Sequence, residues 1–250
     1  MRKDAYVSRP IHVAVLDSGL RSDERAELGE IREAWKGSFD SYEDRTGHGT
    51  TCARLIRKAA PSAHLYIVKI FDITGATSPE LVLQGLQWCI DNGMDVVNVS
   101  VAVPEVGYYH EFADICRRAA SHNITIVSAA DNMGRPCLPA YCETVIGVGG
   151  AHVREAMILH RPGHPIEFYA SPEGNDPRGG GQGSSYATAR ISGLIAKTLS
   201  NFESRDIAVI RAIVAHGGLP YDHNAQPLAE YADCDLVRMA TPIIHRSYLA

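Results

Sequence analysis

Short apolar runs alternate along this chain with segments of helical periodicity, and the alternation predicts its secondary structure. The run 11–16 is β-branched and apolar and ends in Asp17, which is typical of a buried strand followed by a turn. In 79–92, leucines and an isoleucine recur at helical spacing, and Gly93 follows as a helix terminator. The same pattern predicts further strands over 65–71, 96–103, 124–129 and 144–148, and helices over 48–60, 111–121, 186–199 and 205–216.

Strands that alternate with helices indicate an α/β fold. We expect a three-layer sandwich, in which helices flank a mostly parallel central sheet on both faces. The chain of 250 residues shows no internal repeat, no low-complexity tract and no convincing linker. It is therefore predicted to form a single domain over 1–250, with 1–10 as a short N-terminal extension. In a sheet of this kind, functional side chains gather at the carboxyl ends of the strands.

Composition excludes several classes of partner. The chain is 45% hydrophobic and 21% charged, and its formal net charge of −5, with a pI of about 6.1, offers no basic surface for nucleic acid. The sequence lacks Lys/Arg runs that would bind an anionic membrane and any apolar stretch of roughly 18 residues that could span one. The first ten residues lack the apolar core of a signal peptide. We therefore expect a cytoplasmic protein that binds neither nucleic acid nor membrane.

The cysteines support the same location. There are six, at irregular spacing, and in a chain of this size they are expected to be free thiols rather than a disulfide framework. The alternative is one local pair between Cys137 and Cys142.

Three polar segments stand out, and each has an ordinary explanation when taken alone. Asp17 ends a buried apolar strand, where a carboxylate is costly unless it is paired, but it could be a turn or capping residue. His48 lies between Gly47 and Gly49 at a predicted helix start, where a surface or capping histidine is also common. Ser185 follows a glycine-rich stretch and would by itself be a helix N-cap.

The order of these residues favours a functional explanation. His48 follows Asp17 by 31 residues, and Ser185 follows His48 by 137. In α/β-hydrolases the order is Ser, Asp, His and in chymotrypsin-like enzymes His, Asp, Ser, whereas the order here is that of the subtilisins. The matching segments are Asp17-Ser-Gly, Gly47-His-Gly-Thr50 and Gly183-Ser-Ser-Tyr-Ala187, which resemble the Asp, His and Ser motifs of the subtilisin-like serine peptidases, the subtilase family.

The resemblance implies a mechanism and a set of site residues. Ser185 is the nucleophile, His48 the general base that later protonates the leaving amine, and Asp17 the carboxylate that orients the imidazole. Ser128-Ala-Ala-Asp-Asn132 resembles the family's oxyanion segment, so Asn132 is expected to bind the oxyanion together with the backbone N–H of Ser185. Val96-Val-Asn-Val-Ser100 resembles the strand that pairs with the substrate backbone. The expected substrate-binding residues are Ser100, Val101, Ala102, Ala130 and Asp131.

The chain departs from the family pattern at several of these positions. Thr51 replaces a frequent histidine, and Cys52, which some members share, is expected to be a small packed residue. Ala102 replaces a glycine and narrows or reshapes the pocket for the substrate residue before the scissile bond (P1). Asp131 also replaces a glycine. Its carboxylate could favour a basic P1 residue, or it could point outward and accept hydrogen bonds in a turn.

Neither a metal nor a cofactor is expected. The calcium-binding loop of many secreted relatives is missing after the His motif, and the eleven histidines show no metal-ligand spacing. About ten residues precede the first strand, so we expect no inhibitory prodomain within the chain. The segment 220–250 matches the family poorly, although 231–239 could form a closing strand and helix, and this segment could contact a protein partner.

Together these features predict a serine endopeptidase that acts on a restricted peptide or protein substrate, such as a precursor peptide. Two alternatives stay open at this point. The first is a transamidase with the same fold, which would form a macrocyclic peptide by aminolysis of the same acyl-enzyme. The second is a non-catalytic binding module, which the complete set of catalytic residues disfavours.

Overall fold

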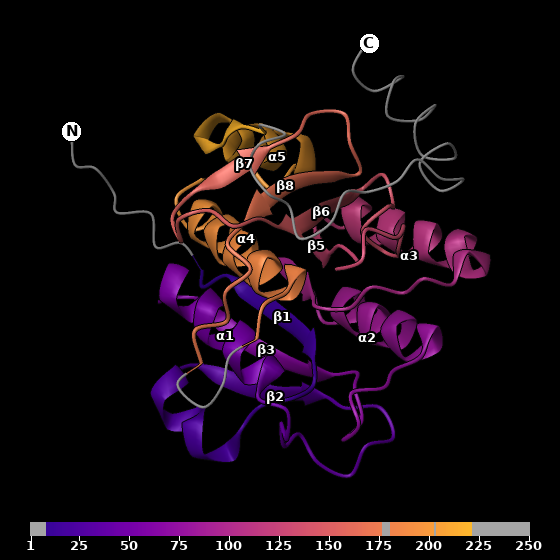
Figure 1. Cartoon of the computed structure of the whole chain (residues 1–250). Helices are drawn as coiled ribbons and strands as arrows, with labels where there is room; N and C mark the ends of the chain where they lie inside the picture. The colour runs from indigo at the N-terminus through magenta and orange to yellow at the C-terminus, as the bar shows by residue number, and fades with distance from the viewer. Residues whose placement is uncertain (1–8, 177–180, 203, 222–250) are drawn as a thin grey trace.

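A computed structural model describes residues 9–176, 181–202 and 204–221 (Figure 1). Within these residues a nine-stranded sheet has the order β2-β3-β1-β4-β5-β6-β8-β7-β9. The strands are β1 His12–Asp17, β2 Ile31–Trp35, β3 His64–Lys69, β4 Val96–Val99, β5 Thr125–Ala129, β6 Val145–Gly150, β7 Ile158–His160, β8 Ile166–Ala170 and β9 Leu219–Pro220. The helices are α1 His48–Ala59, α2 Pro79–Asp91, α3 Tyr109–Ser121, α4 Ser184–Leu199 and α5 Ile207–Gly217, with short 3-10 helices over Ser22–Leu28 and Val106–Tyr108.

The sheet is buried on both faces, which explains the continuous apolar runs. In β1, Val13 and Val15 belong to the hydrophobic cluster that contains α1, α4 and α5, whereas Ala14 and Leu16 belong to the cluster that contains α2 and α3. Along the sheet, the seven neighbouring strands β2, β3, β1, β4, β5, β6 and β8 are all parallel. The next strand, β7, pairs antiparallel to β8. The expected three-layer α/β sandwich is thereby confirmed, with helices on both faces (Figure 1).

The chain reverses its direction of travel across the sheet next to β1. From β1 it runs to β2 at the sheet edge and through α1 to β3 on one side, and it then returns through α2 to β4 on the other side. Such a switch point opens a crevice at the carboxyl ends of the two central strands. Asp17 ends β1, and Ser100 follows the end of β4, where its backbone N–H still donates to the carbonyl of Leu16 at 3.2 Å.

The sequence pattern missed the strands near the sheet edges. β2 buries only one of its residues well and exposes two charged ones, because one of its sides has no neighbouring strand. β8 contains Glu167, which interrupts an otherwise apolar pattern. The carboxylate of Glu167 is offset in the fold by His160 of the neighbouring strand β7 at 3.2 Å and by Arg211 of α5 at 3.3 Å, and the latter pairing joins segments too far apart for a local pattern to reveal.

Several boundaries also differ from the prediction, by two to four residues. The strand predicted over 96–103 ends at Val99, because the chain beyond it pairs with another loop: Val103 and Leu138 exchange two backbone hydrogen bonds of 2.9 and 2.8 Å. The helix predicted from residue 186 begins at Ser184. The predicted strand and helix within 231–239 lie outside the described residues.

The described helices contain none that is long and apolar enough to cross a membrane. Five of the six cysteines fall within the described residues, and all five are buried free thiols, Cys137 and Cys142 included.

Helices α1 and α4 approach each other closely on one face of the sheet. Gly193 of α4 makes this possible, because a Cβ at this position would lie 2.7 Å from the Ala59 side chain and 3.1 Å from the carbonyl oxygen of Ile56. We expect Gly193→Ala to lower the free energy of unfolding by about 1–3 kcal/mol, through overpacking. Thermal and denaturant unfolding would measure this change.

The matched control is Gly217→Ala at the end of α5, where a Cβ would meet no atom within 4 Å. It should change stability by less than about 0.5 kcal/mol. Equal stability of the two variants would mean that α1 and α4 can separate without cost.

Candidate active site

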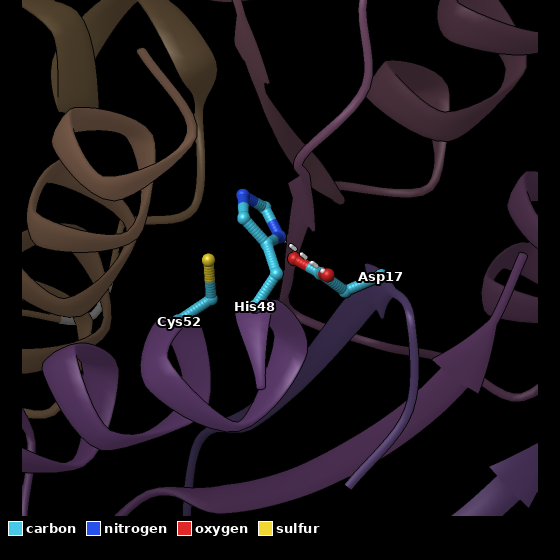
Figure 2. A group of neighbouring side chains, drawn as sticks. All are labelled: Asp17, His48 and Cys52. Atoms are coloured by element: carbon cyan, nitrogen blue, oxygen red, sulfur yellow. Dashed lines mark hydrogen bonds and ion pairs between the residues drawn. The ribbon is translucent and has the colours of Figure 1, made fainter. Parts of the chain in front are cut away.

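The end of β1 and the start of α1 bring Asp17 and His48 together. His48 Nδ1 lies 2.7 Å from Asp17 Oδ1 (Figure 2), and the same carboxylate oxygen accepts the backbone N–H of Ser18 at 2.7 Å. The carboxylate is fully buried. A buried carboxylate is stable only with donors of this kind, so Asp17 is held in one orientation by the elements around it.

The surroundings of His48 suit a general base. The side chain is 32% exposed, and its second ring nitrogen points away from Asp17 (Figure 2). Burial lowers the pKa of the imidazole, but the charge and hydrogen bond of Asp17 and the charge of Asp44 outweigh burial and raise it above the ordinary value. The hydrogen bond to Asp17 fixes the tautomer with a proton on Nδ1, which leaves Nε2 free to take a proton.

Ser185 is the second residue of α4 and lies beside the Asp17–His48 pair. Its neighbour Tyr186 has a ring centroid 5.0 Å from that of His48, which places the start of α4 next to the imidazole. The hydroxyl of Ser185 donates to the carbonyl of Ser100 at 3.3 Å. Since Ser100 stands beside the end of β1, the structure brings all three sequence-predicted residues to one edge of the sheet. Proton transfer to His48 requires the Ser185 hydroxyl to turn from this carbonyl toward the imidazole.

Asn132 lies next to the position that an oxyanion at the start of α4 would occupy. Its side-chain oxygen accepts the backbone N–H of Ser184 at 2.8 Å, which directs the amide group toward the helix start. A Cβ on Gly183 would lie 3.4 Å from the Asn132 amide nitrogen, in ordinary van der Waals contact, so the amide group lies directly beside the residue that precedes α4. The backbone N–H of Ser185 is in the first turn of α4, where no carbonyl within the helix can accept it. These two groups can act together as donors to a developing oxyanion.

The predicted substrate-binding residues follow two neighbouring strands. Ser100, Val101 and Ala102 come directly after β4, and Ala130 comes directly after β5. Ser100 and Ala130 are buried, and Ala102 is half-buried. The role of these residues in holding a substrate stays a prediction.

Asp131 takes the turn arrangement rather than offering a free carboxylate. Arg135 donates to it through Nη2 at 2.8 Å, and the backbone N–H of Met133 donates at 2.8 Å. Burial raises the pKa of Asp131, but these hydrogen bonds outweigh burial and bring the pKa below its usual range. A carboxylate that is already paired with a guanidinium has little charge left to attract a basic P1 side chain.

Sequence reasoning missed a charged cluster that connects the loop before Ser185 to α1. Asp176 accepts from Arg21 Nη1 at 3.0 Å and from the hydroxyl of Thr51 at 3.0 Å. Arg21 packs over Gly47, where an added Cβ would lie 1.8 Å from the guanidinium and where the backbone has a φ of +80°. In the sequence, Thr51 stands out only because it replaces a frequent histidine of the family. Its partner Asp176 is 125 residues away, so no local signal could have revealed the pair.

Cys52 lies beside His48, four residues later on α1 (Figure 2). Its sulfur is 3.5 Å from the Ser100 hydroxyl and 3.9 Å from the carbonyl oxygen of Ser185. The ligand atoms of Asp17, His48 and Cys52 all lie within 4.8 Å of one another. This proximity follows from the Asp17–His48 hydrogen bond and the helical spacing on α1, and the buried thiol fills the space behind the site as expected.

These features define a class of protein: an α/β sandwich that places an Asp–His pair and a helix-borne serine at a switch point of its sheet, as the subtilisin fold does. The chain belongs to the subtilase family, whose sequence profile (peptidase family S8) matches residues 8–224.

The chain is similar to several bacterial proteases in sequence. It is 28% identical over 241 residues to subtilisin NAT of Bacillus subtilis subsp. natto, an alignment that covers 84% of this chain and 61% of that protein. It is 26% identical over 238 residues to the subtilisin of Bacillus pumilus, covering 84% of each. The chain thus spans about three fifths of the length of subtilisin NAT and most of the second relative.

Solved structures share the fold at lower identity. A lanthipeptide protease superposes with a TM-score of 0.70 at 19% identity, over 94% of this chain and 87% of that one. The nisin leader peptidase NisP of Lactococcus lactis superposes with a TM-score of 0.66 at 16% identity, over 85% of each chain.

The position of Cys52 generates a test of the site. Burial and the nearby charge of Asp17 raise the pKa of its thiol well above the ordinary value, so the reactive thiolate should be scarce in the folded protein. We expect iodoacetamide at pH 8 to leave Cys52 unmodified in the native protein, as measured by peptide mass spectrometry. The same treatment in guanidinium should modify all six cysteines. Rapid alkylation of native Cys52 would contradict the closed packing behind His48.

Proposed function

We propose that this protein is a serine endopeptidase that hydrolyses peptide bonds through an acyl-enzyme on Ser185. One observation carries the proposal: the buried Asp17 carboxylate holds His48 at 2.7 Å, beside a serine at the start of α4. This arrangement can activate a hydroxyl and stabilise an oxyanion at the same place, which is the requirement of acyl transfer.

The chemistry would proceed in two halves. The Ser185 oxygen attacks the scissile carbonyl carbon while its proton passes to His48 Nε2, and Asp17 stabilises the resulting imidazolium. Asn132 and the backbone N–H of Ser185 would hold the tetrahedral oxyanion, which collapses as His48 protonates the leaving amine. Water then attacks the ester carbonyl carbon while His48 takes its proton. The second tetrahedral intermediate collapses by breaking its bond to the Ser185 oxygen, which takes that proton back from His48.

We further propose a restricted peptide substrate, such as a precursor peptide whose leader is removed. Two of the similar folds are a lanthipeptide protease and a nisin leader peptidase, which supports this class of substrate. We also propose a cytoplasmic location. A restricted substrate fits that location, because a general degradative activity would be hazardous there. The buried free thiols agree with a reducing compartment. We also propose that a protein partner binds through 220–250, a segment that lies almost wholly outside the described part of the chain.

The first test is covalent labelling. A fluorophosphonate probe should form an adduct on Ser185 of the wild-type protein, because it traps a serine that a histidine has activated. The Ser185→Ala variant should form none, and mass spectrometry of the intact and digested protein would show both results. Absence of an adduct on the folded wild-type protein would favour a non-catalytic binding module.

A second test identifies the reaction. Precursor peptides with a leader should be cleaved to linear products by the wild-type protein, and Ser185→Ala should reduce the rate by more than about 10⁴-fold. Liquid chromatography with mass spectrometry distinguishes the products, because a hydrolysed core peptide is one water heavier than a macrocycle. A cyclic product would assign the protein to the transamidases, and cleavage of an unstructured protein at many sites would remove the restricted substrate from the proposal.

A further inference from the structure

A second carboxylate is buried next to the catalytic pair, and the mechanism above does not use it. Asp44 lies in the loop between β2 and α1 and is 1% exposed. It is surrounded by hydrogen-bond donors from both sides of the site. These are Ser18 Oγ at 2.8 Å, the backbone N–H groups of Thr46 at 3.1 Å, Gly47 at 2.8 Å and Thr50 at 2.9 Å, and the hydroxyls of Thr46 at 2.9 Å and Thr50 at 2.7 Å.

Asp44 acts as the N-terminal cap of the helix that carries His48. The residue before that helix is Gly47, which has no side chain to accept a hydrogen bond. The carboxylate of Asp44 takes over this task by accepting the N–H of Thr50, and its negative charge lies at the positive end of the helix dipole. The direction in which α1 starts, and therefore the position of His48, depends on this contact.

Asp44 also reaches the catalytic aspartate through one hydroxyl. Ser18 Oγ is 2.8 Å from Asp44 Oδ1 and 3.2 Å from Asp17 Oδ1, and it accepts the N–H of Gly49 at 3.0 Å. A hydroxyl carries one proton, and the shorter contact directs it to Asp44. The Asp17 oxygen that faces His48 is then left to the imidazole and the backbone N–H of Ser18.

The charges around His48 are unequal in number. Lys69 is buried and donates from Nζ to the carbonyl oxygens of Ser18 and Glu43. The carboxylates of Asp44, Glu43 and Asp17 act on its charge, and Arg45 opposes them, so three anions stand near two cations. Burial raises the pKa of Tyr186 to about 12 and that of Cys52 well above its ordinary value, so both stay neutral at pH 7. Asp17 and Asp44 are the carboxylates whose charges act on His48 directly. The other titratable and charged groups on the elements packed around it are Glu43 and Arg45 of the loop before α1, Lys69 of β3, Cys52 of α1, Tyr186 of α4, and Asp176, which is paired with Arg21.

We propose that Asp44 is a positioning residue of the active site, which holds Ser18 and the first turn of α1 in place and stabilises the protonated form of His48. The inference builds on the proposed peptidase function, but it concerns the protonation equilibrium of His48, which exists without substrate. Hydrogen bonds from Thr50, Ser18 and Thr46 outweigh burial and keep the pKa of Asp44 below its usual range, so the carboxylate is ionised when His48 titrates.

The test is the titration of His48 in the full-length protein, followed by NMR of ¹⁵N-histidine-labelled samples. His48→Ala identifies its signals among the eleven histidines. In Asp44→Asn the pKa of His48 should fall by about half a unit, because the loss of a nearby negative charge favours the neutral imidazole. With a peptide substrate, the acid limb of kcat/KM should move in the same direction, and kcat should fall about tenfold with little change in KM.

The matched control is Asp95→Asn. Asp95 is an aspartate of similar burial, 2% exposed, that pairs with Arg9 and accepts the N–H of His12 at the other end of β1. It should cost stability without moving the titration of His48. Should Asp44→Asn fail to unfold cooperatively, Ser18→Ala tests the same connection, because it removes the bridge while both charges stay. It should lower kcat with a smaller change in the pKa of His48.

An unchanged His48 titration in folded Asp44→Asn, or an equal shift in Asp95→Asn, would overturn the proposal. The titration is independent of catalysis. A wild-type protein that neither reacts with the fluorophosphonate nor cleaves peptides would contradict the proposed function, while the measured pKa of His48 would still decide the role of Asp44.

Discussion

The burial of the Asp17 carboxylate at the end of β1 is the constraint on which the rest of the site depends. A charge at the carboxyl end of a buried parallel strand is expensive unless hydrogen bonds replace water. The backbone of Ser18 and the imidazole of His48 supply those bonds directly, at 2.7 Å each. The aspartate is therefore stable only when α1 begins at the right place, and the start of α1 in turn requires its own cap.

Close approach of backbone segments makes this arrangement possible. A Cβ at Gly49 would lie 2.5 Å from the carbonyl oxygen of Gly19 and 3.1 Å from the Asp17 side chain, so only glycine lets α1 sit against the end of β1. Gly193 plays the same part between α4 and α1. These two glycines thus set the distances between the elements that carry Asp17, His48 and Ser185.

Polar contacts beneath α4 fix the position of Ser185 from the other side. Ser192 donates to Asn98 of β4 at 3.0 Å, and Asn98 donates to the hydroxyl of Ser100 at 2.8 Å. The carbonyl of Ser100 holds the Ser185 hydroxyl. A line of buried hydrogen bonds therefore connects the helix of the nucleophile to the strand that the substrate is expected to follow, and buried networks of this kind specify one arrangement when every member is satisfied.

By itself, the sequence determined the α/β class, most of the central strands and helices along the chain, and, through the resemblance to the subtilase motifs, the identity of Asp17, His48, Ser185 and Asn132 as candidates. These follow from short-range patterns: apolar runs of strand length, helical periodicity, and motifs of three to five residues. Only the tertiary structure decided the edge strands, the pairing of Asp131 with Arg135, the tie between Arg21 and Asp176, and the burial of Asp44. Each of these depends on which side chains meet, and for most of them the partners come from segments far apart in the chain, where no local pattern carries the information.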